Sequence, residues 1–282
     1  MSGYHIRKIL VPVDLSETSL NALDTAVSIA KRHGASIYLL NIVENNLDGL
    51  QDEPMFSGGI SNTIDVLNAL AGAIEHANDI TPEVIQVEGN VTESIIKFTL
   101  RNMCDLIVMG THGASGYRDG FIGTNTYSIM KYAACPVLSI PPKRKFLSFK
   151  KVLFPIRPVS GALMRYDVVS NLLSGNSAMD VLGLSYRKME RETNVLDKIL
   201  DEIRNRLVED RIRVNINWNN TIAITDDILE FSQANNSDLI IVTSVLDITT
   251  KPGFIGPHSQ KIINCSKVPV LNIKKLPVPS WV

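Results

Sequence analysis

A glycine-rich segment at residues 110–126 has the composition of a phosphate-binding loop. Glycine occurs five times within 14 residues, from Gly110 to Gly123, and Thr124 and Thr126 follow directly. Glycines let backbone N–H groups approach a phosphate without an intervening Cβ. A helix is predicted to begin near Thr124, and its first turn adds N–H donors and the positive end of the helix dipole. These residue types at this spacing favour an anionic, phosphate-bearing ligand.

The elements that must position this loop follow from the hydrophobic pattern. In the first half, short runs rich in Val and Ile predict strands near 7–13, 36–43, 83–87, 105–109 and 136–140. Between them, helical spacing predicts helices near 16–33, 63–78, 92–103 and 125–133. Runs that are apolar at successive positions are typical of strands buried on both faces of a parallel sheet. The alternation predicts a doubly wound α/β sheet, whose ligands bind beyond the carboxyl ends of the strands.

The chain also repeats itself. The recurring segments are 105–109 as 238–242, 120–123 as 253–256, and 135–140 as 268–273, all at an offset of 133 residues. Residues 8–13 match residues 151–156 at an offset of 143, so the first half holds ten more residues. The polar stretch from Asn45 to Asn62 is the expected place of these extra residues. The repeat predicts two tandem domains, residues 1–144 and 145–282, each with five strands and four helices.

The spacing Gly110-x2-Gly113-x9-Gly123-Thr124 resembles that of the nucleotide-binding universal stress proteins, whose pattern is G-x2-G-x9-G-[S/T]. The run ILVPVD at residues 9–14 and the run CPVL at residues 135–138 are similar to the first and last strands of that family. The resemblance covers nearly the whole chain and is closest to tandem members. It implies two Rossmann-like domains of the adenine nucleotide alpha hydrolase-like type, each a five-stranded parallel sheet flanked by helices. The strands near 136–140 and 269–273 are expected to pair, which makes an intramolecular pseudo-dimer.

The same resemblance implies a site for ATP, or for ADP or AMP. The residues implied around the base and ribose are Pro12, Val13, Asp14, Val43, Met109 and Gly110. The residues implied around the phosphates are Gly113, Gly123, Thr124, Asn125 and Thr126. His112 is expected to line the pocket as a loop histidine, because no other histidine or acidic cluster near it in sequence supports a catalytic role. A triphosphate favours an accompanying Mg²⁺, for which no protein ligand is assigned. Residue chemistry alone supports the phosphate contacts; adenine comes only from the resemblance.

The second half departs from the motif. At the equivalent positions, Asp14 is replaced by Arg157, Gly110 by Thr243, Gly113 by Leu246 and Thr124 by Pro257. Proline removes an N–H group from the would-be phosphate cradle. We therefore expect the second half to keep the fold and to lose ATP, with Arg157 as a surface or interdomain residue and another anion as the alternative.

Several alternatives stay open at this level. Asp14 could cap the first helix instead of touching a ligand. A lid and a mobile connection are equal alternatives for residues 45–62. The nucleotide sensor has two alternatives. One is a slow ATPase or autophosphorylating enzyme that uses Thr124 or Ser128, with Arg118 and Asp119 nearby. The other is a scaffold that binds no nucleotide.

Composition excludes other classes of function. A net charge of −1 and a pI of about 6.5 provide no field for non-specific nucleic-acid binding. No apolar run approaches the roughly 20 residues of a membrane helix, and no apolar leader segment is recognised at the start. Three scattered cysteines predict neither a disulfide framework nor a metal site, and Cys104 and Cys135 are expected to be inert core thiols. The expected setting is the cytoplasm, with a homo-oligomer left open.

Overall fold

The computed structural model describes residues 4–44, 60–112, 123–142, 145–158, 166–173, 177–185, 190–210, 212–243, 246–247 and 255–274. Gly113, Arg118, Asp119 and residues 45–59 lie outside this part of the chain, so the expectations for them stay predictions. Residues 60–62, expected in a loop, belong to a helix instead. Within the described residues, no helix is long and apolar enough to cross a membrane.

The elements of the first half alternate as predicted. They are β1 (Lys8–Pro12), α1 (Glu17–His33), β2 (Ser36–Val43), α2 (Ile60–Asn78), β3 (Glu83–Glu88), α3 (Val91–Asn102), β4 (Leu106–Gly110), α4 (Thr124–Tyr132) and β5 (Val137–Ile140). The ends of α1 have local causes: the Ser16 side chain accepts from the Ser19 N–H, and Gly34 closes the helix in the left-handed conformation at φ +62°.

The second half has the same order of elements. They are β6 (Lys151–Ile156), α5 (Tyr166–Leu172), β7 (Ala178–Ser185), α6 (Glu190–Glu209), β8 (Arg213–Asn220), α7 (Ile224–Ala234), β9 (Leu239–Thr243), α8 (Pro257–Cys265) and β10 (Val270–Ile273). The prediction of strand and helix alternation in both halves is therefore confirmed.

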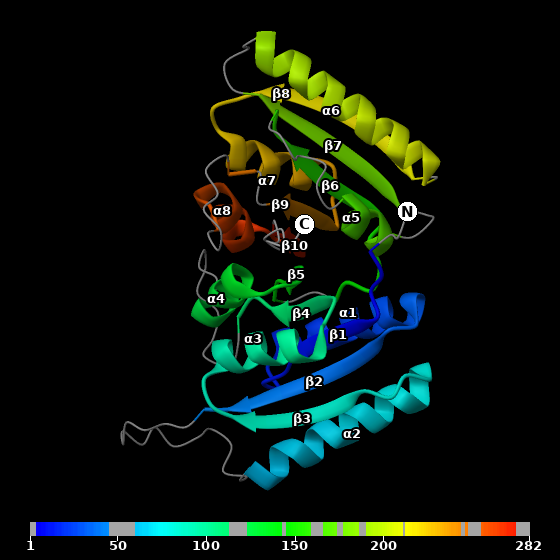
Figure 1. The fold of residues 1–282 in the computed structure, drawn as a ribbon, viewed down its shortest axis with the longest axis vertical. Helices are drawn as coiled ribbons and strands as arrows, with labels where there is room; N and C mark the ends of the chain where they lie inside the picture. Colours follow the sequence, from blue (N-terminus) through cyan, green and yellow to red (C-terminus); the bar gives the residue numbers. More distant parts are fainter. Residues whose placement is uncertain are drawn as a thin grey trace, which may run out of the picture.

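The ten strands of the described residues form one continuous sheet in the order β3-β2-β1-β4-β5-β10-β9-β6-β7-β8. Figure 1 shows this sheet running the length of the molecule, with β3 and β8 at opposite ends. Every neighbouring pair is parallel except β5 and β10, which are antiparallel. Each half thus has the expected doubly wound order, and the last strands of the two halves pair as predicted.

The pairing of β5 with β10 has the symmetry of a two-fold contact. Leu138 lies directly opposite Leu271, its own repeat equivalent at an offset of 133 residues. Ser139 lies opposite Val270, and its hydroxyl donates to the Val270 carbonyl at 3.2 Å. A contact in which equivalent residues meet at the centre is the isologous arrangement of homodimers, here made within one chain.

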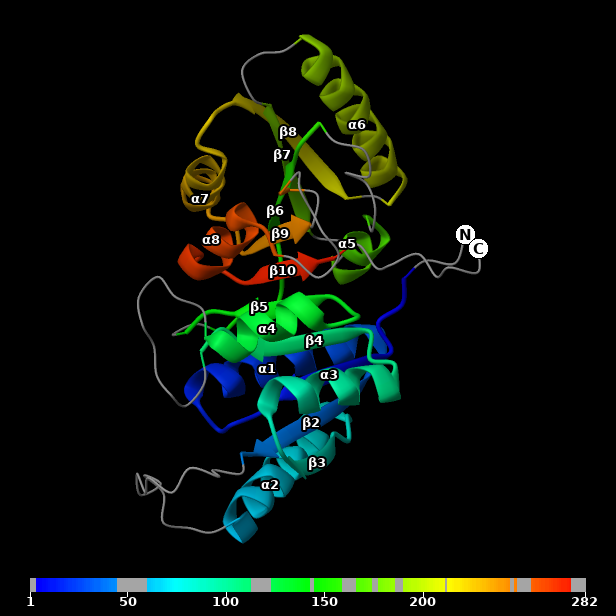
Figure 2. The ribbon, with the colours of Figure 1, turned by 60° about the vertical axis from the view of Figure 1, so that its left-hand side comes forward.

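Two hydrophobic cores cover the two faces of the sheet. One contains Ile9 and Val11 of β1 and the inward faces of α1, α2, α5 and α6, and the other contains Leu10 and the inward faces of α3, α4, α7 and α8. Successive side chains of a strand point to opposite faces, so an uninterrupted apolar run feeds both cores. In Figure 2, α7 and α8 lie on one side of the second half of the sheet and α5 and α6 on the other.

The sequence repeat is also a repeat of hydrogen bonds. The Asp105 carboxylate accepts from the backbone N–H groups of Arg7 and Lys8 at 2.8 and 2.9 Å. Its repeat equivalent, Asp238, accepts from Lys150 and Lys151 at 2.7 and 3.0 Å. In each half this carboxylate therefore ties the start of the first strand to the segment that precedes the fourth strand.

Candidate functional site

A cavity of about 470 Å³ lies at the carboxyl ends of β1 and β4. In the sheet order, β2 and β3 lie on one side of this strand pair and β5 on the other, so the strand order reverses here. Ligands of doubly wound sheets bind at this switch point. The described lining residues are Pro12, Val13, Asp14, Ser19, Ile42, Glu44, Val91, Ile95, Met109, Gly110, His112, Gly123, Thr124, Asn125 and Thr126.

The cavity brings together all the sequence-predicted site residues except Val43 and Gly113. Gly113 lies outside the described residues. Val43 ends β2, and its carbonyl accepts from the Gly89 N–H at 3.0 Å, which ties it to the end of β3. Its neighbours Ile42 and Glu44 line the cavity in its place.

The start of α4 is fixed to the end of β4 by two sets of hydrogen bonds. The Gly123 N–H donates to the Thr111 carbonyl at 3.0 Å. The buried Thr126 hydroxyl lies within donating distance of the carbonyls of Gly110 and Thr111, at 3.2 and 3.3 Å. These two donors therefore position the helix. A helix start leaves its first N–H groups without intrahelical acceptors, so the backbone donors available to a ligand are those of the first turn, at Thr124, Asn125 and Thr126.

Gly110 lies at a close approach of α1 to β4. A Cβ on Gly110 would lie 2.8 Å from the Cβ and 2.9 Å from the hydroxyl of Thr18, closer than packed atoms tolerate. The Thr18 hydroxyl also donates to the carbonyl of His112. The motif glycine therefore lets the start of α1 pack on the end of β4, in addition to lining the cavity.

Asp14 does not cap the first helix. Ser16 is the cap, and the Asp14 carboxylate accepts from the backbone N–H of Ser16 at 3.0 Å and from its hydroxyl at 2.5 Å. The carboxylate thus orders the turn between β1 and α1 at the mouth of the cavity. Asp14 follows β1 and lines the cavity, so its negative charge lies on the β1 side.

His112 lies just beyond the carboxyl end of β4. Its side chain is 9% exposed, and its Nδ1 lies 2.9 Å from the Thr111 hydroxyl. No group of three or more His, Cys, Asp or Glu residues in the described segments could hold a metal ion. His112 is a buried residue that lines the cavity.

Five lining residues were not predicted from the sequence. Ser19, Ile42, Glu44, Val91 and Ile95 come from α1, the end of β2 and the start of α3. The predicted topology could have indicated them, because the loops that follow β1, β2 and β3 all open at the same edge of a parallel sheet. No motif marks these positions in the chain itself.

Cys104 and Cys135, expected to be inert core thiols, differ in burial. Cys104 is buried, Cys135 is half-buried and Cys265 is exposed, and all three are free thiols. Burial raises the pKa of Cys104 to about 11, and burial also raises the pKa of Cys135 far above its usual range. Neither thiol is activated as a nucleophile.

Known proteins share the half of the chain that holds this cavity. The sequence model of the universal stress protein family matches residues 5–141. Universal stress protein MJ0531 of Methanocaldococcus jannaschii is 30% identical over 148 residues, which cover 49% of this chain and 84% of that protein. The chain belongs to the universal stress protein family. Universal stress protein YxiE of Bacillus subtilis is 29% identical over 144 residues, 47% of this chain and 97% of that protein.

A solved universal stress protein from Archaeoglobus fulgidus shares the fold over nearly the whole length. It covers 97% of this chain and 98% of its own, with a TM-score of 0.70 and 20% sequence identity. In this universal stress protein, then, the family model matches residues 5–141, and the shared architecture extends through both halves.

Proposed function

We propose that the cavity of the first half binds an adenine nucleotide, with ATP as the main ligand and ADP or AMP as alternatives, and that the protein acts as a nucleotide-sensing stress-response protein with one such site per chain. The observation that carries the proposal is the position of the cavity. It joins the carboxyl ends of β1 and β4 to the start of α4. Its volume of about 470 Å³ falls in the range of roughly 300–1,000 Å³ usual for small-molecule sites.

The phosphates in this proposal lie at the start of α4. The amides of Thr124, Asn125 and Thr126 are the donors, with the Thr124 hydroxyl and the positive end of the helix dipole. Gly123 contributes by lacking a Cβ, since its own N–H already binds Thr111. Mg²⁺ would be held chiefly by phosphate oxygens and water, as is usual for this ion.

The base and ribose in this proposal lie toward β1 and the middle of the sheet. Pro12, Val13 and Met109 line this part of the cavity, and Asp14 lines it too. The role proposed for the Asp14 carboxylate is to accept from a ribose hydroxyl or from the base edge. The role of Val43 passes to Ile42 and Glu44, which reach the cavity from the same strand end.

The second half, residues 145–282, is proposed to be a degenerate universal stress protein domain that binds no nucleotide. It completes an intramolecular pseudo-dimer with residues 1–144 through β5 and β10. A cytoplasmic setting, in which its free thiols stay reduced, belongs to the same proposal.

Nucleotide stoichiometry tests the proposal. Nucleotide released from denatured protein is identified by chromatography, and emptied protein is titrated with ATP and Mg²⁺ by calorimetry. One ATP per chain is expected. No binding at millimolar ATP would refute the proposal.

Two substitutions locate the site. Thr124→Pro installs the residue found at the equivalent place of the second half, and proline is well tolerated at the first position of a helix. It removes one amide and one hydroxyl from the cradle, so affinity is expected to fall roughly 10- to 100-fold. Gly123→Val should abolish binding, because even a Cβ there lies 3.3 Å from the Thr111 carbonyl. The matched control is Pro257→Thr in the second half, which should leave affinity unchanged.

A further inference from the structure

The start of α8 in the second half already holds a carboxylate. Asp247 is 3% exposed and accepts from the backbone N–H of His258 at 2.8 Å and from that of Ser259 at 3.1 Å. The Ser259 hydroxyl donates to the same carboxylate at 2.5 Å. The helix start is therefore saturated by an anion of its own chain.

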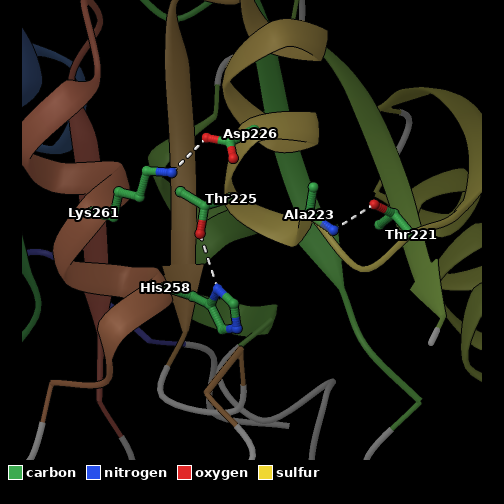
Figure 3. A network of polar contacts seen from close by, with 6 residues as sticks. All are labelled: Thr221, Ala223, Thr225, Asp226, His258 and Lys261. Carbon is green, nitrogen blue, oxygen red and sulfur yellow. Dashed lines mark hydrogen bonds and ion pairs between the residues drawn. The ribbon is translucent and has the colours of Figure 1, made fainter.

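This helix start is the repeat equivalent of the proposed phosphate cradle. At the offset of 133 residues, His258 and Ser259 correspond to Asn125 and Thr126. The contact between neighbouring helices is equivalent too: Thr92 meets Asn125 at 3.3 Å, and Thr225 meets the ring Nδ1 of His258 at 2.9 Å. Figure 3 shows the His258 ring directed at Thr225, beside the Lys261–Asp226 ion pair that also joins α8 to α7.

Gly256, the glycine before α8, has a different structural role from Gly123. A Cβ on Gly256 would overlap the Cβ and the carboxyl carbon of Asp247. At the equivalent position in the first half, Gly123, the nearest atom to a Cβ among the described residues is instead the Thr111 carbonyl oxygen, at 3.3 Å. Gly256 is thus needed so that the backbone can approach Asp247.

The hydrogen-bond donors at the start of α8 and the helix dipole both favour an anion there. Pro257, at the start of α8, has no N–H, so the next two amides and the Ser259 hydroxyl are the donors that face outward from the helix start. All three bind Asp247. A negative charge at a helix N-terminus is stabilised by the helix dipole as well as by these hydrogen bonds.

We infer that Asp247 is an internal substitute for a ligand phosphate: its carboxylate fills the anion site of the second half, stabilises that half, and closes it to phosphate-bearing ligands. The comparison with the first half rests on the proposed function, while the contacts of Asp247 stand by themselves. An inorganic anion site is therefore latent in the second half and is exposed when the carboxylate is removed.

The test compares native protein with Asp247→Ala in an anion-poor buffer. The variant is expected to unfold at a midpoint temperature roughly 4–10 °C lower, since three hydrogen bonds to a charged group are lost. Inorganic phosphate, compared with chloride at equal ionic strength, should then raise the midpoint of the variant by about 2 °C or more beyond its effect on native protein. Amide resonances of His258 and Ser259 should move with phosphate in the variant and stay fixed in native protein.

Two outcomes would overturn the inference: an unchanged midpoint in Asp247→Ala, or a destabilised variant whose His258 and Ser259 amides ignore phosphate. If Asp247→Ala does not fold, Asp247→Ser replaces it, because the shorter, uncharged side chain leaves the anion site open. It should then show the same phosphate response.

The converse substitution separates this inference from the proposed function. Ala114 is the repeat equivalent of Asp247 in the sequence. Ala114→Asp should weaken ATP binding at least tenfold, and the neutral Ala114→Asn should weaken it less; equal affinities in both would contradict the inference. If native protein binds no ATP, the proposed function fails, and the phosphate response of Asp247→Ala still decides the role of Asp247.

Discussion

Gly110 and Gly123 belong to one sequence motif but meet different physical demands. Gly110 makes room for Thr18 of α1, so it serves the packing of a helix on a strand. Gly123 binds Thr111 through its N–H and is the N-cap of α4, so it serves the geometry of the helix start. A ligand motif read from spacing therefore mixes residues that touch the ligand with residues that let the surrounding elements come close.

Substitution of Gly110 tests the packing role directly. Gly110→Ala is expected to lower the free energy of unfolding by ~1–3 kcal/mol, because the new Cβ meets Thr18 at 2.8 Å. The control is Gly72→Ala on the exposed face of α2, where a Cβ meets nothing within 4 Å. That change should raise the free energy of unfolding by about 0.5–1 kcal/mol through helix propensity. Urea unfolding measures both, and equal effects of the two substitutions would contradict the packing role.

At the centre of the sheet, the two halves are joined by a side-chain contact as well as by the pairing of β5 with β10. Beyond the end of β10, the Lys274 ammonium donates to the Lys131 carbonyl at the end of α4, at 2.5 Å. It therefore connects the second half to the first. Burial lowers the pKa of Lys274 to about 8.

The lowered pKa of Lys274 predicts a dependence of stability on pH. Between pH 8 and about 10.5 the unfolded chain binds more protons at this group than the folded chain does. Lys274 therefore lowers stability most below pH 8, and this cost is relieved as the pH rises toward 10.5. Unfolding free energies of native protein and Lys274→Met, measured from pH 7 to 10, should show native protein gaining relative to the variant. A difference between them that does not change with pH would show that the amine is not desolvated.

The whole molecule is held as one sheet by the antiparallel pairing of β5 and β10. Because Leu138 faces its own repeat equivalent, Leu271, each half presents the same kind of edge to the other. A half on its own would expose that edge, with its unpaired backbone groups and apolar side chains.

Separation of the halves tests this symmetry. Residues 1–144 expressed alone are expected to form a homodimer through β5, with Leu138 facing Leu138 of a second copy. Sedimentation and light scattering would measure the mass of the fragment. The full chain, in which the edge of β5 is covered by β10, is the reference. A folded monomer of residues 1–144, or a fragment that does not fold by circular dichroism, would contradict the prediction.

The sequence by itself determined the local elements and the repeat. Helical periodicity and uninterrupted apolar runs depend on neighbouring residues, so the predicted strands and helices agree with the structure to within about three residues at their ends. The spacing of Gly110, Gly123 and Thr124 was enough to place the cavity, because the loop after β4 must open at the carboxyl edge of a parallel sheet.

Only the tertiary structure decided which donors face the cavity and what else lines it. The Gly123 N–H and the Thr126 hydroxyl are engaged by β4, and Ser19, Ile42 and Ile95 reach the cavity from elements distant in the chain. The binding of Asp247 to the start of α8 likewise follows from no local sequence pattern, because Asp247 lies ten residues before the first residue of the helix. Contacts of this kind depend on how folded elements approach one another in space, which the periodicity of a segment does not encode.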